Sequence, residues 1–180
     1  MDRTRHLQLM ARYNQWMNDT LYAAAATLSD AQLFADNRAF FGSLFNTLNH
    51  LVVADTIWLK RFTRHPAQWP SLAPILPLDN PQGLDQRLFH QLDELTAHRH
   101  WLDGVIIGWT VELTEADLDE TLHYANTSGV HYRRDFYALA THFFNHQTHH
   151  RGQATTLLSQ AGVDIGSTDL LGLIANEIER

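Results

Sequence analysis

The segment Thr141–Gln153 carries four of the chain's twelve histidines. Each residue of an α-helix advances by about 100°, so His142, His146 and His150 share one face, with His149 near the same arc. This i, i+4 spacing lets two imidazole nitrogens reach one ion, as in zinc-binding helices. A packed core does not require rings that each keep two polar nitrogens. The segment therefore predicts a metal or catalytic site, and the alternative is a solvated face rich in histidine.

A single residue argues against one enzyme class. Zinc proteases place a glutamate directly after the first histidine of such a pair, where it acts as the general base. Here Gln147 follows His146. An amide does not take a proton from water at neutral pH, so we do not expect a zinc protease.

The ligand set must be completed from another part of the chain. His146 and His150 form the best pair, while His142 and His149 are either further ligands or partners that orient a ligand. His50 is the natural third ligand, although a single histidine at such a position is more often structural. The chain has no cysteine, so thiolate sites, disulfides and a cysteine nucleophile are excluded. Three neutral imidazoles with open positions describe a catalytic zinc, nickel or iron site.

Length and charge limit the remaining possibilities. The 180 residues suit one domain, 1–180, with a sizeable core. The net charge of −7 argues against a nucleic-acid partner, which would favour a basic face. We see neither a secretory signal nor an apolar run long enough for a membrane span. We therefore expect a cytoplasmic protein that does not bind membranes.

Hydrophobic spacing predicts an all-α fold in which four long helices form a bundle and position these histidines. The predicted helices cover about 4–28, 43–64, 81–107 and 135–161. All five prolines lie between the second and third helices, and Asn80-Pro81 reads as the start of the third. We also expect a capped helical turn at Ser29, a small hairpin over 121–134 and a last helix near 167–179.

Four residues do not fit a plain apolar pattern. Asp55 lies on the apolar stripe of the second helix, and a buried carboxylate needs partners. Phe40 and Phe41 are expected to close one end of the core. Gly152 lies inside the fourth helix at a cost of about 1 kcal/mol, so we expect close approach of another helix there.

Three stretches of the sequence resemble the DinB family of bacterial metal-binding four-helix bundles. They are Tyr13–Asn18 followed by Leu21, Ser43–His50 followed by Asp55 and Trp58, and His142–Gln153, which ends His-His-Arg-Gly-Gln. The last stretch is the most specific, and together the three extend over nearly the whole chain. The resemblance implies an up-down-down-up bundle, commonly a homodimer, with a divalent metal held by His50, His146 and His150.

The family also includes thiol-dependent enzymes. We therefore expect a metal-dependent transferase or hydrolase acting on a small molecule, with a low-molecular-weight thiol as the candidate cosubstrate. The alternative is a metal-binding stress-response or dimeric interaction protein without turnover. Asp55, His142 and His149 are the candidates for a catalytic base, and the sequence does not choose among them.

Overall fold

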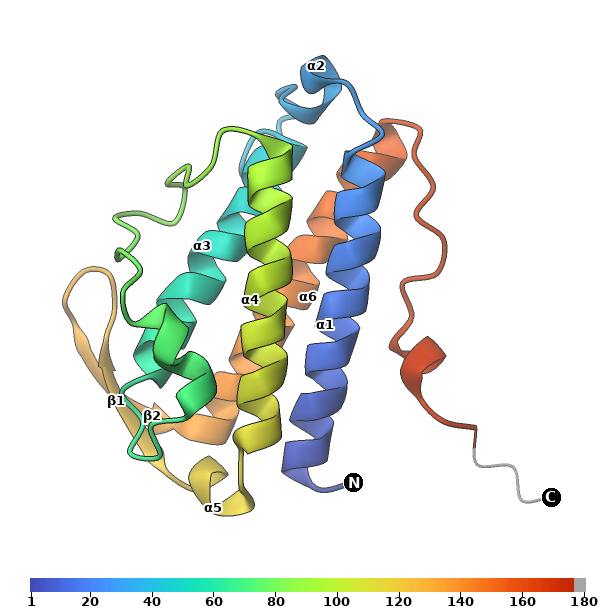
Figure 1. Ribbon diagram of the computed structural model, residues 1–180. Coiled ribbons are helices and arrows are strands. Elements are labelled where there is room, and N and C mark those ends of the chain that lie inside the picture. Colours follow the sequence, from blue (N-terminus) through green and yellow to red (C-terminus); the bar gives the residue numbers. More distant parts are fainter. Residues whose placement is uncertain (177–180) are drawn as a thin grey trace.

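The computed structural model describes residues 1–176, and four long helices dominate this part of the chain. They are α1 (Arg3–Ala25), α3 (Leu44–Phe62), α4 (Leu92–Glu112) and α6 (Phe136–Gln160). Figure 1 shows α1 and α6 running upward and α3 and α4 running downward. α1 and α3 each pack against both α4 and α6. The predicted all-α class is confirmed.

Side-chain caps set several helix ends. The Ser43 hydroxyl accepts a hydrogen bond from the Asn46 amide, which confirms the predicted start of α3. A capping box at Ser29 begins the short α2 (Asp30–Leu33), also as predicted. α6 ends just before Gly162, whose φ of +83° is a left-handed conformation that favours glycine.

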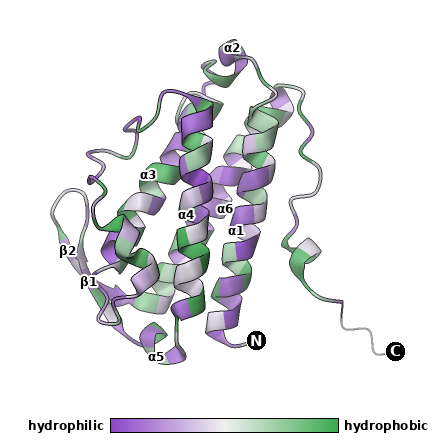
Figure 2. Ribbon diagram, in the orientation of Figure 1, coloured by the Kyte–Doolittle hydropathy of each residue, from purple (hydrophilic) through white to green (hydrophobic). Residues whose placement is uncertain are grey.

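The core lies between the four helices and is rich in aromatic side chains. Figure 2 shows that each long helix carries both hydrophobic and hydrophilic residues. Phe62 of α3, Trp109 of α4 and Phe143 of α6 are almost completely buried, and their rings contact one another. Burial of each such side chain stabilises the fold by about 1.5–3 kcal/mol. This packing fixes α3 against α6, the two helices that carry the candidate ligands.

The third long helix begins later than predicted. α4 starts at Leu92 rather than at Pro81 and continues to Glu112. A short 3₁₀ helix, η1 (Pro70–Ile75), and an irregular connector precede it. The Asn49 side chain binds this connector, donating to the Gln86 carbonyl at 2.7 Å and accepting from the Leu88 amide at 2.9 Å. These contacts hold the connector along α3 and engage the Gln86 carbonyl and the Leu88 amide, which are therefore not paired within a helix.

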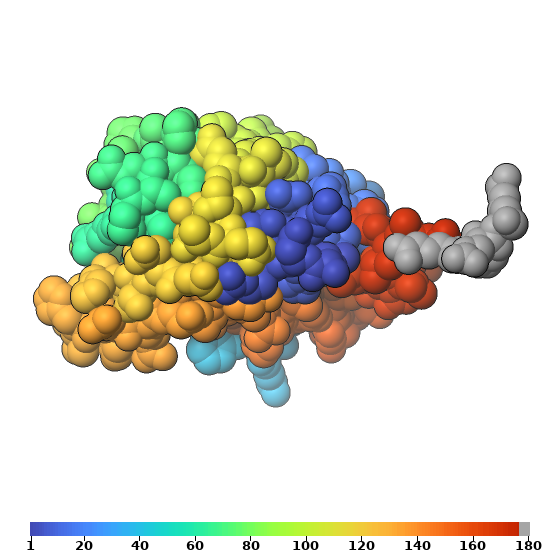
Figure 3. Space-filling model, turned by 90° about the horizontal axis from the view of Figure 1, so that it is seen from below, coloured from blue at the N-terminus to red at the C-terminus, as the bar shows by residue number. Residues whose placement is uncertain are grey.

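The hairpin is confirmed, with β1 (Thr121–Ala125) antiparallel to β2 (His131–Asp135) after a helical turn, α5 (Glu115–Leu118). The predicted last helix is wrong for residues 167–176, which contain only the 3₁₀ turn η2 (Leu170–Leu173), and its final residues lie outside the described part. The Thr168 carbonyl accepts a hydrogen bond from the Tyr13 hydroxyl at 2.6 Å instead of from a helical amide. Figure 3 shows this segment, in red, beside α1.

No helix within residues 1–176 is both long enough and apolar enough to cross a bilayer.

Candidate metal centre

Three of the predicted histidines meet where α3 packs against α6. His50 projects from α3, and His146 and His150 project from successive turns of α6. One ring nitrogen from each lies within 4.8 Å of the other two. The Nε2 atoms of His50 and His146 are 3.4 Å apart. The structure thus brings together nitrogens from two elements that are far apart in the sequence.

Hydrogen bonds orient two of the three rings. The Nδ1–H of His50 donates to the Leu84 carbonyl at 2.7 Å, and that of His150 donates to Gln153 Oε1 at 2.8 Å. A proton on Nδ1 leaves the Nε2 lone pair free in the neutral ring. Such bonds from the distal nitrogen are the usual support of a metal-binding histidine. The donor set therefore fits a divalent ion that accepts imidazole ligands, such as zinc, nickel or iron.

The cluster is shielded but not sealed. His50 and His150 are 2 % and 8 % exposed, whereas His146 is half-buried. The Phe41 ring stacks on the His50 ring with centroids 4.0 Å apart. Phe41 thus covers the cluster rather than the end of the core, and Phe40 is 83 % exposed, so the core-closing role predicted for both residues is wrong. The reason is that the connector between α2 and α3 places the Phe41 ring against the face of the His50 imidazole.

Burial keeps the cluster uncharged. It lowers the pKa of His50 and of His150, and together with the neighbouring imidazoles it lowers the pKa of His146 to about 3. The three rings are therefore neutral near pH 7 and have free lone pairs for a cation. Within the described residues, no carboxylate joins these nitrogens in a metal-binding group.

The two other histidines of the α6 motif lie outside the cluster. His142 and His149 are both exposed. The His142 ring packs edge-on against Trp58 at a centroid distance of 5.1 Å, next to His146. His149 lies 3.4 Å from the Gln153 amide nitrogen. Both positions border the site, so both remain candidates for proton transfer.

Gly152 does not mark close helix packing. Among residues 1–176, a Cβ built at this position would meet no atom within 4 Å apart from its chain neighbours and the helix's own backbone. The predicted approach of another helix is therefore wrong. The residue faces outward because α6 turns His150 and Arg151 toward its neighbours and leaves Gly152 on the open side.

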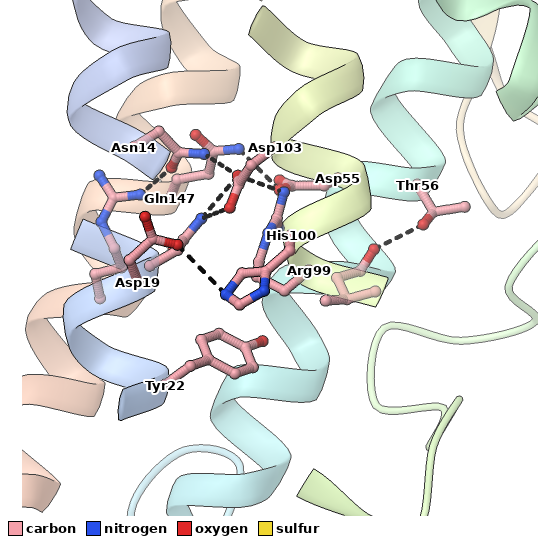
Figure 4. Close-up of polar contacts among 12 residues, drawn as sticks. Asn14, Asp19, Tyr22, Asp55, Thr56, Arg99, His100, Asp103 and Gln147 are labelled. Carbon is pink, nitrogen blue, oxygen red and sulfur yellow. Dashed lines mark hydrogen bonds and ion pairs between the residues drawn. The ribbon is translucent and has the colours of Figure 1, made fainter. Parts of the chain in front are cut away.

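Asp55 belongs to a buried polar layer rather than to the histidine cluster. Its Oδ2 accepts hydrogen bonds from Arg99 Nη1 at 2.6 Å and from Gln147 Nε2 at 2.8 Å (Figure 4). Burial raises the pKa of the Asp55 carboxyl, and the Arg99 charge and these hydrogen bonds oppose the rise. The predicted need of this carboxylate for partners is confirmed. Its lone pairs are directed at groups from α4 and α6.

The polar layer continues across the bundle to α1. Asp103 pairs with Arg99 at 2.9 Å and accepts hydrogen bonds from the side chains of Asn14 and Asn18. Arg151 donates to Asn14. The layer therefore joins all four long helices, and its two carboxylates are matched by two guanidinium groups.

The sequence reasoning missed the groups that orient the ligands. The spacing of Gln153 and His150, i to i+3 on one helix, is a signal that was available. The Leu84 carbonyl was not recognisable, because a backbone group leaves no trace in residue type. The stacking of Phe41 on His50 was also missed, because the sequence does not show which ring a connector residue contacts.

Comparison with known proteins agrees with this architecture. The model of the DinB family matches residues 1–180. The chain is 25 % identical over 157 residues to Protein DinB of Bacillus subtilis (strain 168), a match that covers 87 % of each protein. No solved structure matches the chain. Because the family match extends over the full sequence, the chain belongs to the DinB family.

Proposed function

We propose that His50, His146 and His150 hold one divalent metal ion and that the protein is a metal-dependent transferase or hydrolase for a small molecule. The observation that supports this most directly is the convergence of three imidazole nitrogens within 4.8 Å. Two of the rings are already oriented with Nε2 free. A site prepared in this way needs little reorganisation on binding a cation.

The ligand set indicates the kind of chemistry. When bound, the ion would supply Lewis acidity and, with no anionic ligand to offset its charge, would lower the pKa of a water or thiol at a remaining position. Phe41 and the buried faces of His50 and His150 limit the access of water. His146 is the most exposed of the three rings, so a substrate would approach the ion from its side.

The chain also supplies candidate groups for proton transfer. His142 and His149 are exposed at the border of the cluster. Within residues 1–176, neither forms an ion pair with a carboxylate. Asp55 is a weaker candidate, because its carboxylate is held by Arg99 and Gln147. The protein has no cysteine, so a thiol would have to come from a cosubstrate.

Two further parts of the proposal come from the family resemblance. The protein is expected to form a homodimer, which sedimentation equilibrium would measure. The alternative function is metal binding without turnover, in a stress-response or interaction protein.

A turnover assay of metal-loaded protein tests the enzymatic proposal. One arm combines low-molecular-weight thiols with a chlorinated or epoxide electrophile, and the other uses an ester panel without thiol. Metal-dependent product in the first arm supports transfer, and in the second it supports hydrolysis. If His150→Ala and chelation leave both reactions unchanged, the enzymatic proposal is wrong.

A further inference from the structure

A cavity of about 600 Å³ lies along the C-terminal half of α3. The other walls come from residues 76–82 of the connector and from residues 125–127 at the hairpin turn. Figure 1 shows these two segments on the same side of the bundle as α3. This volume suits a small organic molecule rather than an ion or a macromolecule.

The cavity is basic, in contrast to the acidic chain as a whole. Lys60, Arg61 and Arg64 line it, and no aspartate or glutamate among residues 1–176 does. The remaining polar wall consists of amide and hydroxyl side chains, including Gln82 and Asn126. With a net charge of −7 for the whole protein, such a concentration of positive charge is a local feature that needs an explanation.

Neither arginine is neutralised by another part of the described chain. Within residues 1–176, Arg61 and Arg64 form no ion pair with a carboxylate. The Arg61 guanidinium rests on the rings of Trp58 and Tyr124, 4.5 and 5.1 Å from their centroids. Stacking in this way holds the group in place and leaves its N–H edges free. Lys60 donates to the carbonyls of Leu76 and Leu78, which anchors the connector beside the two arginines.

The cavity and the histidine cluster share two structural elements. Ile57 lines the cavity two turns after His50 on the same face of α3, a separation of about 10 Å along the helix axis. Gln82 also lines it, and its backbone N–H donates to Gln86 Oε1 at 2.6 Å. Leu84, between these two glutamines, is the residue whose carbonyl orients His50.

A chain of aromatic contacts also joins the two sites. Arg61 lies over Trp58, Trp58 contacts His142, and His142 lies beside His146 at a centroid distance of 6.0 Å. Trp58 and His142 thus lie between the Arg61 guanidinium and His146 of the cluster.

We propose that this cavity binds the oxyanion end, carboxylate or phosphate, of a small organic molecule and directs its other end toward His50, His146 and His150. The guanidinium fork matches the geometry of either oxyanion, and an apolar wall that includes Ile57 accommodates a short carbon chain. The directing role rests on the proposed function, whereas anion binding does not.

Calorimetric titration of the metal-free protein tests anion binding without any turnover. The probes are two pairs that differ in charge: glutarate with glutaramide, and glycerol 3-phosphate with glycerol. We expect at least one anion to bind, more weakly as salt is raised, and its neutral partner not to bind. The stronger anion identifies the oxyanion that the cavity prefers.

Arg64→Gln is the informative variant, because this exposed side chain has no polar partner within residues 1–176 whose loss would disturb folding. It should weaken anion binding about tenfold, the effect of one charge-assisted hydrogen bond. Arg12→Gln, at an exposed position on α1, is the matched control and should bind normally. Failure of both anions to bind, or equal binding by both variants, would overturn the proposal.

The directing role has a separate readout. With cobalt(II) loaded, the methylene protons of bound glutarate or glycerol 3-phosphate should relax faster than with zinc, and Arg64→Gln should reduce the difference in proportion to its weaker binding. Binding without this enhancement would place the anion elsewhere and overturn the directing role. An inactive protein that passes both tests would contradict the proposed function and leave the anion site intact.

Discussion

The histidine cluster and the buried polar layer are built from the same helix but have opposite electrostatic designs. α6 supplies His146 and His150 to the cluster and, one residue later in each case, Gln147 and Arg151 to the layer. The layer contains its own counter-charges, because Asp55 and Asp103 both pair with Arg99, and Arg151 joins the layer through Asn14. The cluster contains only neutral rings.

This difference explains why one region is a candidate ion site and the other is not. The buried Asp55 carboxylate already accepts hydrogen bonds from Arg99 and Gln147, so its charge is compensated without a metal ion. Imidazoles held close together with no acidic partner leave their lone pairs free. Helical spacing alone does not distinguish the histidine cluster from the polar layer, since both use i, i+4 pairs on α6.

Breaking the polar layer should have the largest effect on stability. Asp55→Ala leaves the Arg99 charge buried with only one carboxylate, and we expect a loss of about 3–5 kcal/mol in the free energy of unfolding. Urea denaturation measures it. Asp19→Ala is the matched control, because Asp19 is exposed and pairs with His100 across 3.3 Å at the surface (Figure 4), which predicts a change below about 1 kcal/mol. Equal losses in the two variants would contradict the role of the layer.

Two glutamines of α6 give the next contrast. Gln153→Leu removes the acceptor of the His150 Nδ1–H, and we expect about a 10–100-fold weaker metal affinity with little change in stability. Gln147→Leu removes a donor to Asp55 and should lower stability while the metal affinity is retained. Competition with a chromophoric chelator and thermal melting measure the two quantities. The reverse pattern would show that the glutamines had been assigned to the wrong regions.

Acid should destabilise the metal-free protein through the cluster. Burial lowers the folded-state pKa of His50, His146 and His150 below the unfolded value of about 6.5, so the unfolded chain binds more protons in acid. Stability is therefore full above pH 6.5 and falls as the pH drops toward the His146 pKa of about 3.

Melting temperatures of chelator-treated protein between pH 7.5 and 5 measure this loss. His146→Ala should flatten the curve, whereas His123→Ala, which removes an exposed histidine of β1, should not. Parallel curves for His146→Ala and the parent would refute the explanation.

The smallest expected effect concerns the open side of α6. Gly152→Ala adds a methyl group where no atom of the described chain lies within 4 Å apart from the chain neighbours and the helix's own backbone. We expect a gain of about 0.5–1 kcal/mol in stability, because alanine loses less backbone entropy in a helix, and an unchanged metal affinity. A loss of stability would indicate a neighbour at this position.

Much of the fold and of the metal centre was predictable because helices carry periodic signals. The spacing and the Ser43 cap located the helix that bears His50, and the four-histidine motif located its partner helix. The connector was predicted wrongly because Asn80-Pro81 resembles a helix start, while tertiary contacts with Asn49 decide its conformation. Asp55 signalled its need for partners but not their identity, since Arg99 lies on a helix that sequence alone does not bring next to it.

Metal analysis of protein purified without an affinity tag is the most direct test of the proposed three-histidine metal site. The variants are the three ligand replacements His50→Ala, His146→Ala and His150→Ala, with His142→Ala and His149→Ala as controls from the same motif. We expect one divalent ion per chain in the parent and in both controls, and its loss in each ligand variant. Full occupancy in His146→Ala and His150→Ala, or equal loss in the controls, would contradict it.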